Sequence, residues 1–243
     1  MTGRDLAGKS AFVSGSGRNI GRAVALELTR RGCNVVLNGS ADRAACEAVA
    51  EAARAHGVET LVAMGDVSQP EAVVAIARVA LDRFGAIDIL VNNAGFRPHK
   101  PFLENTDEDW QAVIGIDLTA SFLLARAFLP GMVERRWGRV IGMTGMKAIH
   151  GYVEGAPISA AKHGVWGLTK ALAKEFGPHG ITVNAISPGP IRSDGQPETA
   201  APEIPVGHKG DPGDIAALVG FLASDTGRFI TGQMIAANGG AQT

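Results

Sequence analysis

The chain of 243 residues is long enough for one large domain or two small ones. Its composition, 46% hydrophobic and 19% charged, supports a substantial core and argues against disorder. The formal net charge is -1, with both signs interspersed, which argues against binding to nucleic acid or to an anionic membrane surface. The N-terminus has no long apolar segment typical of a signal peptide, and no uninterrupted apolar run approaches the ~20 residues that span a bilayer. Cys33 and Cys46 have no metal-ligand spacing, so we expect a cytoplasmic protein with reduced thiols and no metal site.

Short apolar segments alternate along the chain with longer helical patterns. Strands are expected over residues 10–15, 34–38, 60–67, 87–95, 138–144, 181–187 and 234–238. Helices are expected over residues 20–31, 42–56, 69–84, 106–136, 159–176 and 212–223. Thr106 can cap its helix in a capping-box arrangement with Asp109, and Ser159 is expected to cap the helix that it begins.

The expected strands are nearly continuous apolar runs, as in strands that are covered on both faces. Alternating strands and helices predict a parallel sheet with right-handed crossovers. We therefore expect a single Rossmann-like, doubly wound α/β domain over residues 1–243, with about seven strands and helices on both faces. The proline-containing segment 192–213 shows little periodicity, and a loop of this length in a compact domain is typical of a substrate lid.

A glycine-rich turn, SGSGRNIG at residues 14–21, lies between the first expected strand and the first helix. Glycines at this place let the backbone approach a pyrophosphate, and the N–H groups of the helix N-terminus point at its charge. Ile20 occupies the third glycine position of the GxGxxG pattern, so the turn by itself also fits a tight connection without a ligand.

The end of the second expected strand bears on which dinucleotide would bind. An NAD site needs an acidic residue there for the adenosine 2′-hydroxyl, and no acid occurs between Glu27 and Asp42. Arg18, Ser40 and Arg43 can instead contact a 2′-phosphate, which favours NADP(H) over NAD(H). The alternative is that both arginines are ordinary surface cations.

Further motifs follow in order: Asp66-Val67, the NNAG at 92–95, the SAAKHG at 159–164, Asn184, the PGPI at 188–191 and the C-terminal FLASDTGRFITGQMIAANGG. With the glycine turn, they resemble the short-chain dehydrogenase/reductase family over essentially the full length, in a form like the 3-oxoacyl-acyl-carrier-protein reductases. The resemblance implies a nucleotide-binding oxidoreductase that acts on a small-molecule substrate.

The resemblance also implies a set of cofactor-binding residues. They are Gly15, Ser16, Gly17, Arg18, Asn19, Ile20 and Gly21 in the turn, Ser40, Asp66, Val67, Asn92, Ala94 and Gly95 along the adenosine side, and Lys162, Pro188, Gly189, Ile191 and Ser193 towards the nicotinamide. Asn19 replaces a glycine that is usual in the family, and asparagine tolerates a positive φ.

Family members reduce a carbonyl with a tyrosine that donates the proton, a lysine that lowers the tyrosine's pKa, a serine that binds the substrate oxygen and an asparagine that supports the lysine through water. Only Lys162 stands as expected here. Ile158 lies at the tyrosine position, Gly145 at the serine position, and Asp117 at the asparagine position, where it could pair with Lys162 or alter its water network.

Three neighbouring side chains are candidate substitutes. Thr144 carries a hydroxyl beside the serine position, or is simply a strand-end residue. Tyr152, the only tyrosine, lies in the expected loop after the fifth strand and either reaches the substrate or packs there. His150 can act as acid or base near neutrality. His99 and Lys100 are expected to border the substrate cleft.

Three functions remain open. The first is an NADP(H)-dependent carbonyl reductase or alcohol dehydrogenase with a non-standard proton donor. The second is a nucleotide-binding pseudoenzyme or sensor, and the third is a non-redox lyase or isomerase on the same scaffold. By resemblance, a homodimer or homotetramer is expected to pair through helices 106–136 and 159–176.

Overall fold

The computed structural model describes residues 3–197 and 200–242. Its sheet has seven strands in the order β3-β2-β1-β4-β5-β6-β7, and every neighbouring pair is parallel. The expected doubly wound α/β architecture is confirmed. The strands are β1 (Ser10–Val13), β2 (Asn34–Leu37), β3 (Thr60–Val62), β4 (Ile89–Asn92), β5 (Gly138–Met143), β6 (Ile181–Pro188) and β7 (Met234–Ala237).

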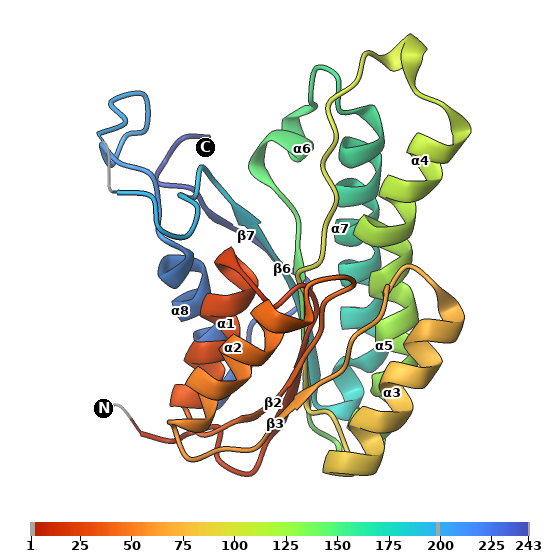
Figure 1. Cartoon of the computed structure of the whole chain (residues 1–243), viewed down its shortest axis with the longest axis vertical. Coiled ribbons are helices and arrows are strands. Elements are labelled where there is room, and N and C mark those ends of the chain that lie inside the picture. The colour runs from red at the N-terminus through yellow and green to blue at the C-terminus, as the bar shows by residue number, and fades with distance from the viewer. Residues whose placement is uncertain (1–2, 198–199, 243) are drawn as a thin grey trace.

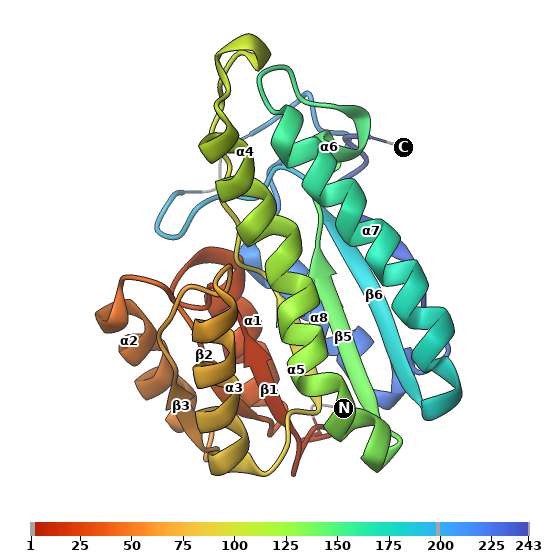
Figure 2. The same cartoon turned by 90° about the vertical axis from the view of Figure 1, so that its right-hand side faces the viewer.

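Helices cover both faces of this sheet (Figures 1 and 2). One face carries α1 (Asn19–Arg30), α2 (Arg43–Arg54) and α8 (Pro212–Ala223), and the other carries α3 (Pro70–Phe84), α4 (Asp107–Ile114), α5 (Ala120–Arg135) and α7 (Ala156–Phe176). Successive strand residues alternate between the two cores: Val13 packs with α1 and Phe12 packs with α5. The carboxyl ends of the strands therefore meet at one edge, where ligands bind in folds of this kind.

The helix after β4 is continuous but irregular. Thr106 and Asp109 form the expected capping box at its start. A π turn, Gly115–Thr119, joins α4 to α5, and such turns often accompany functional sites.

By length and composition alone, the continuous helix Asp107–Arg135 would be able to cross a membrane. Half of its most apolar window is nevertheless buried inside the protein. The helix packs against α3, α7 and strands β4 and β5, so it serves as a core helix of this domain.

The region after β5 differs from the expectation in two ways. A short helix, α6 (Met146–His150), precedes Tyr152, so His150 ends a helix rather than lying in a loop. Helix α7 begins at Ala156, and Gly155 takes the position before it, with a proline in the first turn. Ser159 therefore lies inside the helix, where its hydroxyl accepts a hydrogen bond from the Tyr152 N–H at 3.2 Å instead of capping.

Candidate functional site

The glycine turn has the shape that a dinucleotide cradle requires. Gly15 has φ of 62°. A Cβ on Gly21 would lie 2.1 Å from the Gly15 carbonyl oxygen, so only glycine fits there. The N-cap residue of helix α1, Arg18, makes no capping hydrogen bond with its side chain, and the first turn has no acidic residue, which leaves this N-terminus suited to an anion from elsewhere.

Asn19, the residue that replaces the family's glycine, has φ of 47°, as expected. It also binds a carboxylate that the sequence did not suggest. The Asn19 N–H donates to Asp194 Oδ2 at 2.6 Å, and the Asp194 N–H donates to Asn19 Oδ1 at 2.9 Å. Arg22 adds an ion pair to the same carboxylate oxygen at 3.7 Å. A side chain from the expected lid segment thus lies at the N-terminus of α1.

Two residues that sequence reasoning missed hold the glycine turn against β4. Asn93 Nδ2 donates to the carbonyl oxygens of Ser14 and Gly15, both at 3.0 Å. The Ser14 hydroxyl accepts the N–H groups of Asn93 and Ala94 at 2.9 and 3.0 Å. Asn93, the second asparagine of the NNAG motif, could have been identified from the sequence, because a side-chain amide at a strand end can form hydrogen bonds with a neighbouring loop.

Several expected cofactor residues turn their side chains elsewhere. The buried Ser16 hydroxyl donates to the Asn38 carbonyl at 3.2 Å and accepts the Asn38 N–H at 2.9 Å. Val67 is 1% exposed and belongs to the core beside α5. These two side chains point into the protein and support the turns that carry them. Any contact of Ser16 or Val67 with a cofactor would therefore come from the backbone.

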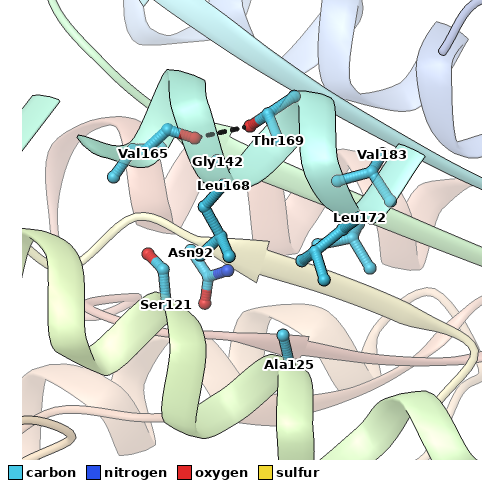
Figure 3. A pocket seen from close by; sticks show the side chains of 10 residues that line it. Asn92, Ser121, Ala125, Gly142, Val165, Leu168, Thr169, Leu172 and Val183 are labelled. Atoms are coloured by element: carbon cyan, nitrogen blue, oxygen red, sulfur yellow. Dashed lines mark hydrogen bonds between the residues drawn. The ribbon is translucent and has the colours of Figure 1, made fainter. Parts of the chain in front are cut away.

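Asn92, also expected at the cofactor, points its side chain between β4 and helices α5 and α7 (Figure 3). It lines a cavity of about 10 Å³ with Ser121 and Thr169. Among the described residues, its Oδ1 has no hydrogen-bond partner. The cavity is large enough for one water molecule at most, so it is too small to bind a substrate.

The remaining cofactor positions lie along the strand ends. Arg18, Ser40, Asp66, Gly95 and Ser193 are exposed. Gly17, Ile20, Ala94, Pro188, Gly189 and Ile191 are half-buried. Gly189 leaves no room for a side chain, because a Cβ there would lie 2.5 Å from Asn238 Cα. The Asp66 carboxylate accepts the Ser68 N–H at 2.9 Å, which fixes the turn after β3.

Lys162 and Asp117 form the centre of the site. Lys162 Nζ lies 2.5 Å from Asp117 Oδ1, and their side chains are 2% and 0% exposed. Lys162 also donates to the Met143 carbonyl at 3.0 Å, and the Phe96 N–H donates to Asp117 Oδ2 at 2.8 Å. Of the two roles considered for Asp117, direct pairing is the one observed.

Burial dominates the electrostatics of this pair. Desolvation lowers the pKa of Lys162 below its ordinary value, the neighbouring Asp117 carboxylate partly opposes this, and the charge of Arg97 adds to the lowering. A lysine with a lowered pKa can exchange a proton more readily near neutrality than a solvated one.

The two positions where the family has hydroxyls differ in their surroundings. Ile158 is 1% exposed and packs with Val113 and Ala161. A Cβ on Gly145 would meet nothing within 4 Å. The tyrosine position is therefore occupied by a packed apolar side chain, whereas the serine position has empty space around it.

The three candidate substitutes are placed differently from one another. Thr144 is 1% exposed, and its hydroxyl donates to the Ile186 carbonyl at 3.0 Å, as a strand-end residue would. The Tyr152 ring packs against the cluster that contains Ile158 and meets His99 edge-on, with 5.6 Å between ring centroids. His150 is exposed.

Two cations expected near the ligands are paired elsewhere. Lys100 lies 2.5 Å from Asp109, the carboxylate of the capping box, which ties the loop after β4 to α4. Arg43 lies 3.3 Å from Glu47 within α2. Neither is therefore as freely available for a ligand as the sequence suggested.

The strand order, with the glycine turn at the first crossover, places the protein in the Rossmann class of α/β folds, in which such a turn commonly binds a dinucleotide. Residues 15–242 match the family model described as enoyl-(acyl carrier protein) reductase. The chain belongs to the short-chain dehydrogenase/reductase family.

Curated relatives and solved structures agree with this assignment. The 3-oxoacyl-[acyl-carrier-protein] reductase FabG of Pseudomonas aeruginosa is 38% identical, over 97% of this chain and 98% of the relative. The reductase of the same name from Staphylococcus epidermidis is 37% identical, over 96% and 98%. The crystal structure of acetoin dehydrogenase YohF from Salmonella typhimurium superposes with a TM-score of 0.91 at 32% identity, covering 96% of this chain and 95% of that one.

Proposed function

We propose that the protein is an NADP(H)-dependent oxidoreductase that transfers hydride between the nicotinamide and a carbonyl or alcohol substrate, with a proton donor other than the family's tyrosine. The observation that carries the proposal is the buried Lys162–Asp117 pair, which lies at the carboxyl end of β5, on the same edge of the parallel sheet as the glycine turn that follows β1. The cofactor would supply the hydride. The backbone of the turn would hold its diphosphate, and Lys162 would contact its ribose.

The preference for NADP(H) rests on charge at the adenosine end. Arg18 and Ser40 are exposed. Asp42, the nearest acid after β2, accepts the Ala45 N–H at 2.9 Å as the cap of α2. A 2′-phosphate would therefore meet a cation and a hydroxyl, with the nearest carboxylate already engaged.

Tyr152 is the better candidate for the proton donor. Its ring packs against the cluster of Ile158, the residue at the family's tyrosine position, whereas His150 lies at the exposed end of α6. The Thr144 hydroxyl already donates to Ile186. Loss of a general acid typically costs ~10²–10⁴-fold in rate, so Tyr152→Phe should lower turnover by that order and His150→Ala should change it little.

The test is NADPH oxidation across a panel of carbonyl compounds, run beside calorimetric titration of NADPH and NADH. Turnover with tighter binding of NADPH than NADH would support the proposal. Equal turnover by wild type and Tyr152→Phe would remove Tyr152 from the mechanism. A Gly145→Ser/Ile158→Tyr double variant should gain carbonyl reduction, since Gly145 has space for a hydroxyl.

A nucleotide-binding sensor without turnover is the second candidate. The apolar burial of Ile158, which leaves no proton donor at the family's tyrosine position, favours it. Tight NADPH binding without oxidation of any carbonyl compound would select this alternative. Turnover without nucleotide binding would instead indicate lyase or isomerase chemistry.

We also propose cytoplasmic function as a homodimer or homotetramer. Among the apolar residues of α5 and α7, Phe122 is 46% exposed. Trp166, Leu168 and Leu172 are half-buried, whereas Leu123, Phe128, Leu129 and Val165 are buried against the sheet. The subunit contact would be formed by the more exposed residues Phe122, Trp166, Leu168 and Leu172. Light scattering that gives a monomer would refute this assembly.

Residues 192–213, of which 198–199 lie outside the described residues, would act as the substrate lid of the single domain 1–243.

A further inference from the structure

One arginine lies close to the Lys162–Asp117 pair without belonging to any of the motifs. Arg97 follows the NNAG motif and is exposed. A Cβ placed on Gly95 would lie 3.7 Å from Arg97 Nη2 and 3.0 Å from Asp117 Oδ1. The guanidinium therefore turns back over Gly95, towards the carboxylate that holds Lys162.

The charges of the described residues do not cancel at this point. Lys162 neutralises Asp117 at 2.5 Å, and the second oxygen of Asp117 accepts the Phe96 N–H. Within residues 3–197 and 200–242, Arg97 forms no ion pair with a carboxylate, although Arg22, Arg31, Arg135 and Arg192 all do. One positive charge is therefore left over beside the Lys162–Asp117 pair.

We propose that Arg97 binds the carboxylate of a short 2-oxo acid and so selects anionic over neutral carbonyl substrates. The inference rests on the proposed reductase function. Arginine presents two parallel N–H donors that match a carboxylate. The proposed function places the nicotinamide ribose at Lys162, and Arg97 lies next to the partner of that lysine, Asp117. A substrate that Arg97 holds and the nicotinamide reduces therefore has only a short spacer between its carboxylate and its carbonyl.

The chemistry balances without a further reactant. The carbonyl carbon accepts a hydride from the reduced nicotinamide, and the carbonyl oxygen accepts one proton, which gives a 2-hydroxy acid and the oxidised nicotinamide. The substrate carboxylate is unchanged. The positive charge of Arg97 also stabilises the negative charge that develops on the carbonyl oxygen.

The experiment compares 2-oxobutanoate with its neutral methyl ester for wild type, Arg97→Leu, Arg97→Lys and a control, Arg78→Leu, which removes an exposed arginine from α3. Arg97→Leu removes hydrogen bonds to a charged group, so kcat/KM for the acid should fall by ~10–100-fold, mainly because KM rises. The ester should change less than ~2-fold, and Arg97→Lys should be intermediate. Equal losses for acid and ester, or none for either, would overturn the inference.

A binding measurement keeps this test separate from the reductase proposal. Oxamate, an unreactive mimic of a 2-oxo acid, and its neutral counterpart oxamide are added to the protein with NADP, and the melting temperature is measured. Oxamate, but not oxamide, should raise the melting temperature of wild type and of Arg78→Leu. Neither compound should raise that of Arg97→Leu. If no carbonyl compound is reduced, the reductase proposal fails while this measurement still decides the role of Arg97. Equal stabilisation of wild type and Arg97→Leu by oxamate, or none of wild type, would refute that role.

Discussion

Asp194 occupies the part of the cradle where a cofactor diphosphate would bind, so neutralising it should tighten NADPH binding. Its carboxylate accepts the Asn19 N–H at 2.6 Å and pairs with Arg22 at 3.7 Å. Two like charges about 4 Å apart repel by ~4 kcal/mol at an effective dielectric of ~20. Because the Asp194 side chain is 35% exposed, solvent screening reduces this repulsion to about 1 kcal/mol. Asp194→Asn should therefore lower the Kd for NADPH by about 5-fold.

The same substitution should slightly destabilise the free protein, because it removes an anion from a helix N-terminus, worth ~0.3–1 kcal/mol. Calorimetric titration with NADPH and thermal unfolding without it measure the two effects. The gain in affinity should shrink as salt is raised. Glu203→Gln is the matched control, since Glu203 is an exposed acid in the same segment. Unchanged or weaker NADPH binding by Asp194→Asn would show that the carboxylate does not compete with the cofactor.

Three further predictions concern stability. Asp117→Leu leaves Lys162 buried without a counter-charge and should lower the free energy of unfolding by ~3–5 kcal/mol. The double variant Asp117→Leu/Lys162→Met should recover most of this loss. Urea unfolding measures both variants, and an unchanged stability of the single variant would contradict the pairing. Thr106→Ala removes the cap of α4 and should cost ~1 kcal/mol, seen as a lower urea midpoint; no change would mean that the cap is dispensable. The hydrogen bond from Arg31 holds the pKa of Asp5 below its ordinary value, so its contribution is present above pH ~4 and is lost as the pH falls below that value. Asp5→Asn should flatten the acid side of the stability profile, and identical profiles would rule this out.

The features predicted well from sequence depend on chemistry between near neighbours. Thr106 and Asp109 are three residues apart, and their capping box forms as expected. Asn19 takes the positive φ that its short polar side chain tolerates. The alternation of strands and helices also predicted the sheet, because each apolar run had to be buried on both faces.

The features that were missed depend on spatial proximity or on competing local signals. Asp194 and Asn19 are 175 positions apart, and no periodic pattern links them. The start of α7 was predicted at Ser159 because serine is a good cap, but the turn at Gly155 with a proline in the first turn starts the helix earlier. Arg97 belongs to no motif, and only the fold brings Asp117, 20 positions further along the chain, next to it across Gly95.

The π turn at Gly115–Thr119 contains Asp117 and gives the site a requirement for chain length as well as for residue type. A π turn accommodates one more residue than a regular helical turn. The turn takes up this extra residue locally, so α4 and α5 keep nearly the rotation of a regular helix that is one residue shorter. Deleting one residue there should therefore restore a regular helix and leave Val113 packed against Ile158. The contact of Asp117 with Lys162, rather than the packing of the helix, is what such a deletion would change.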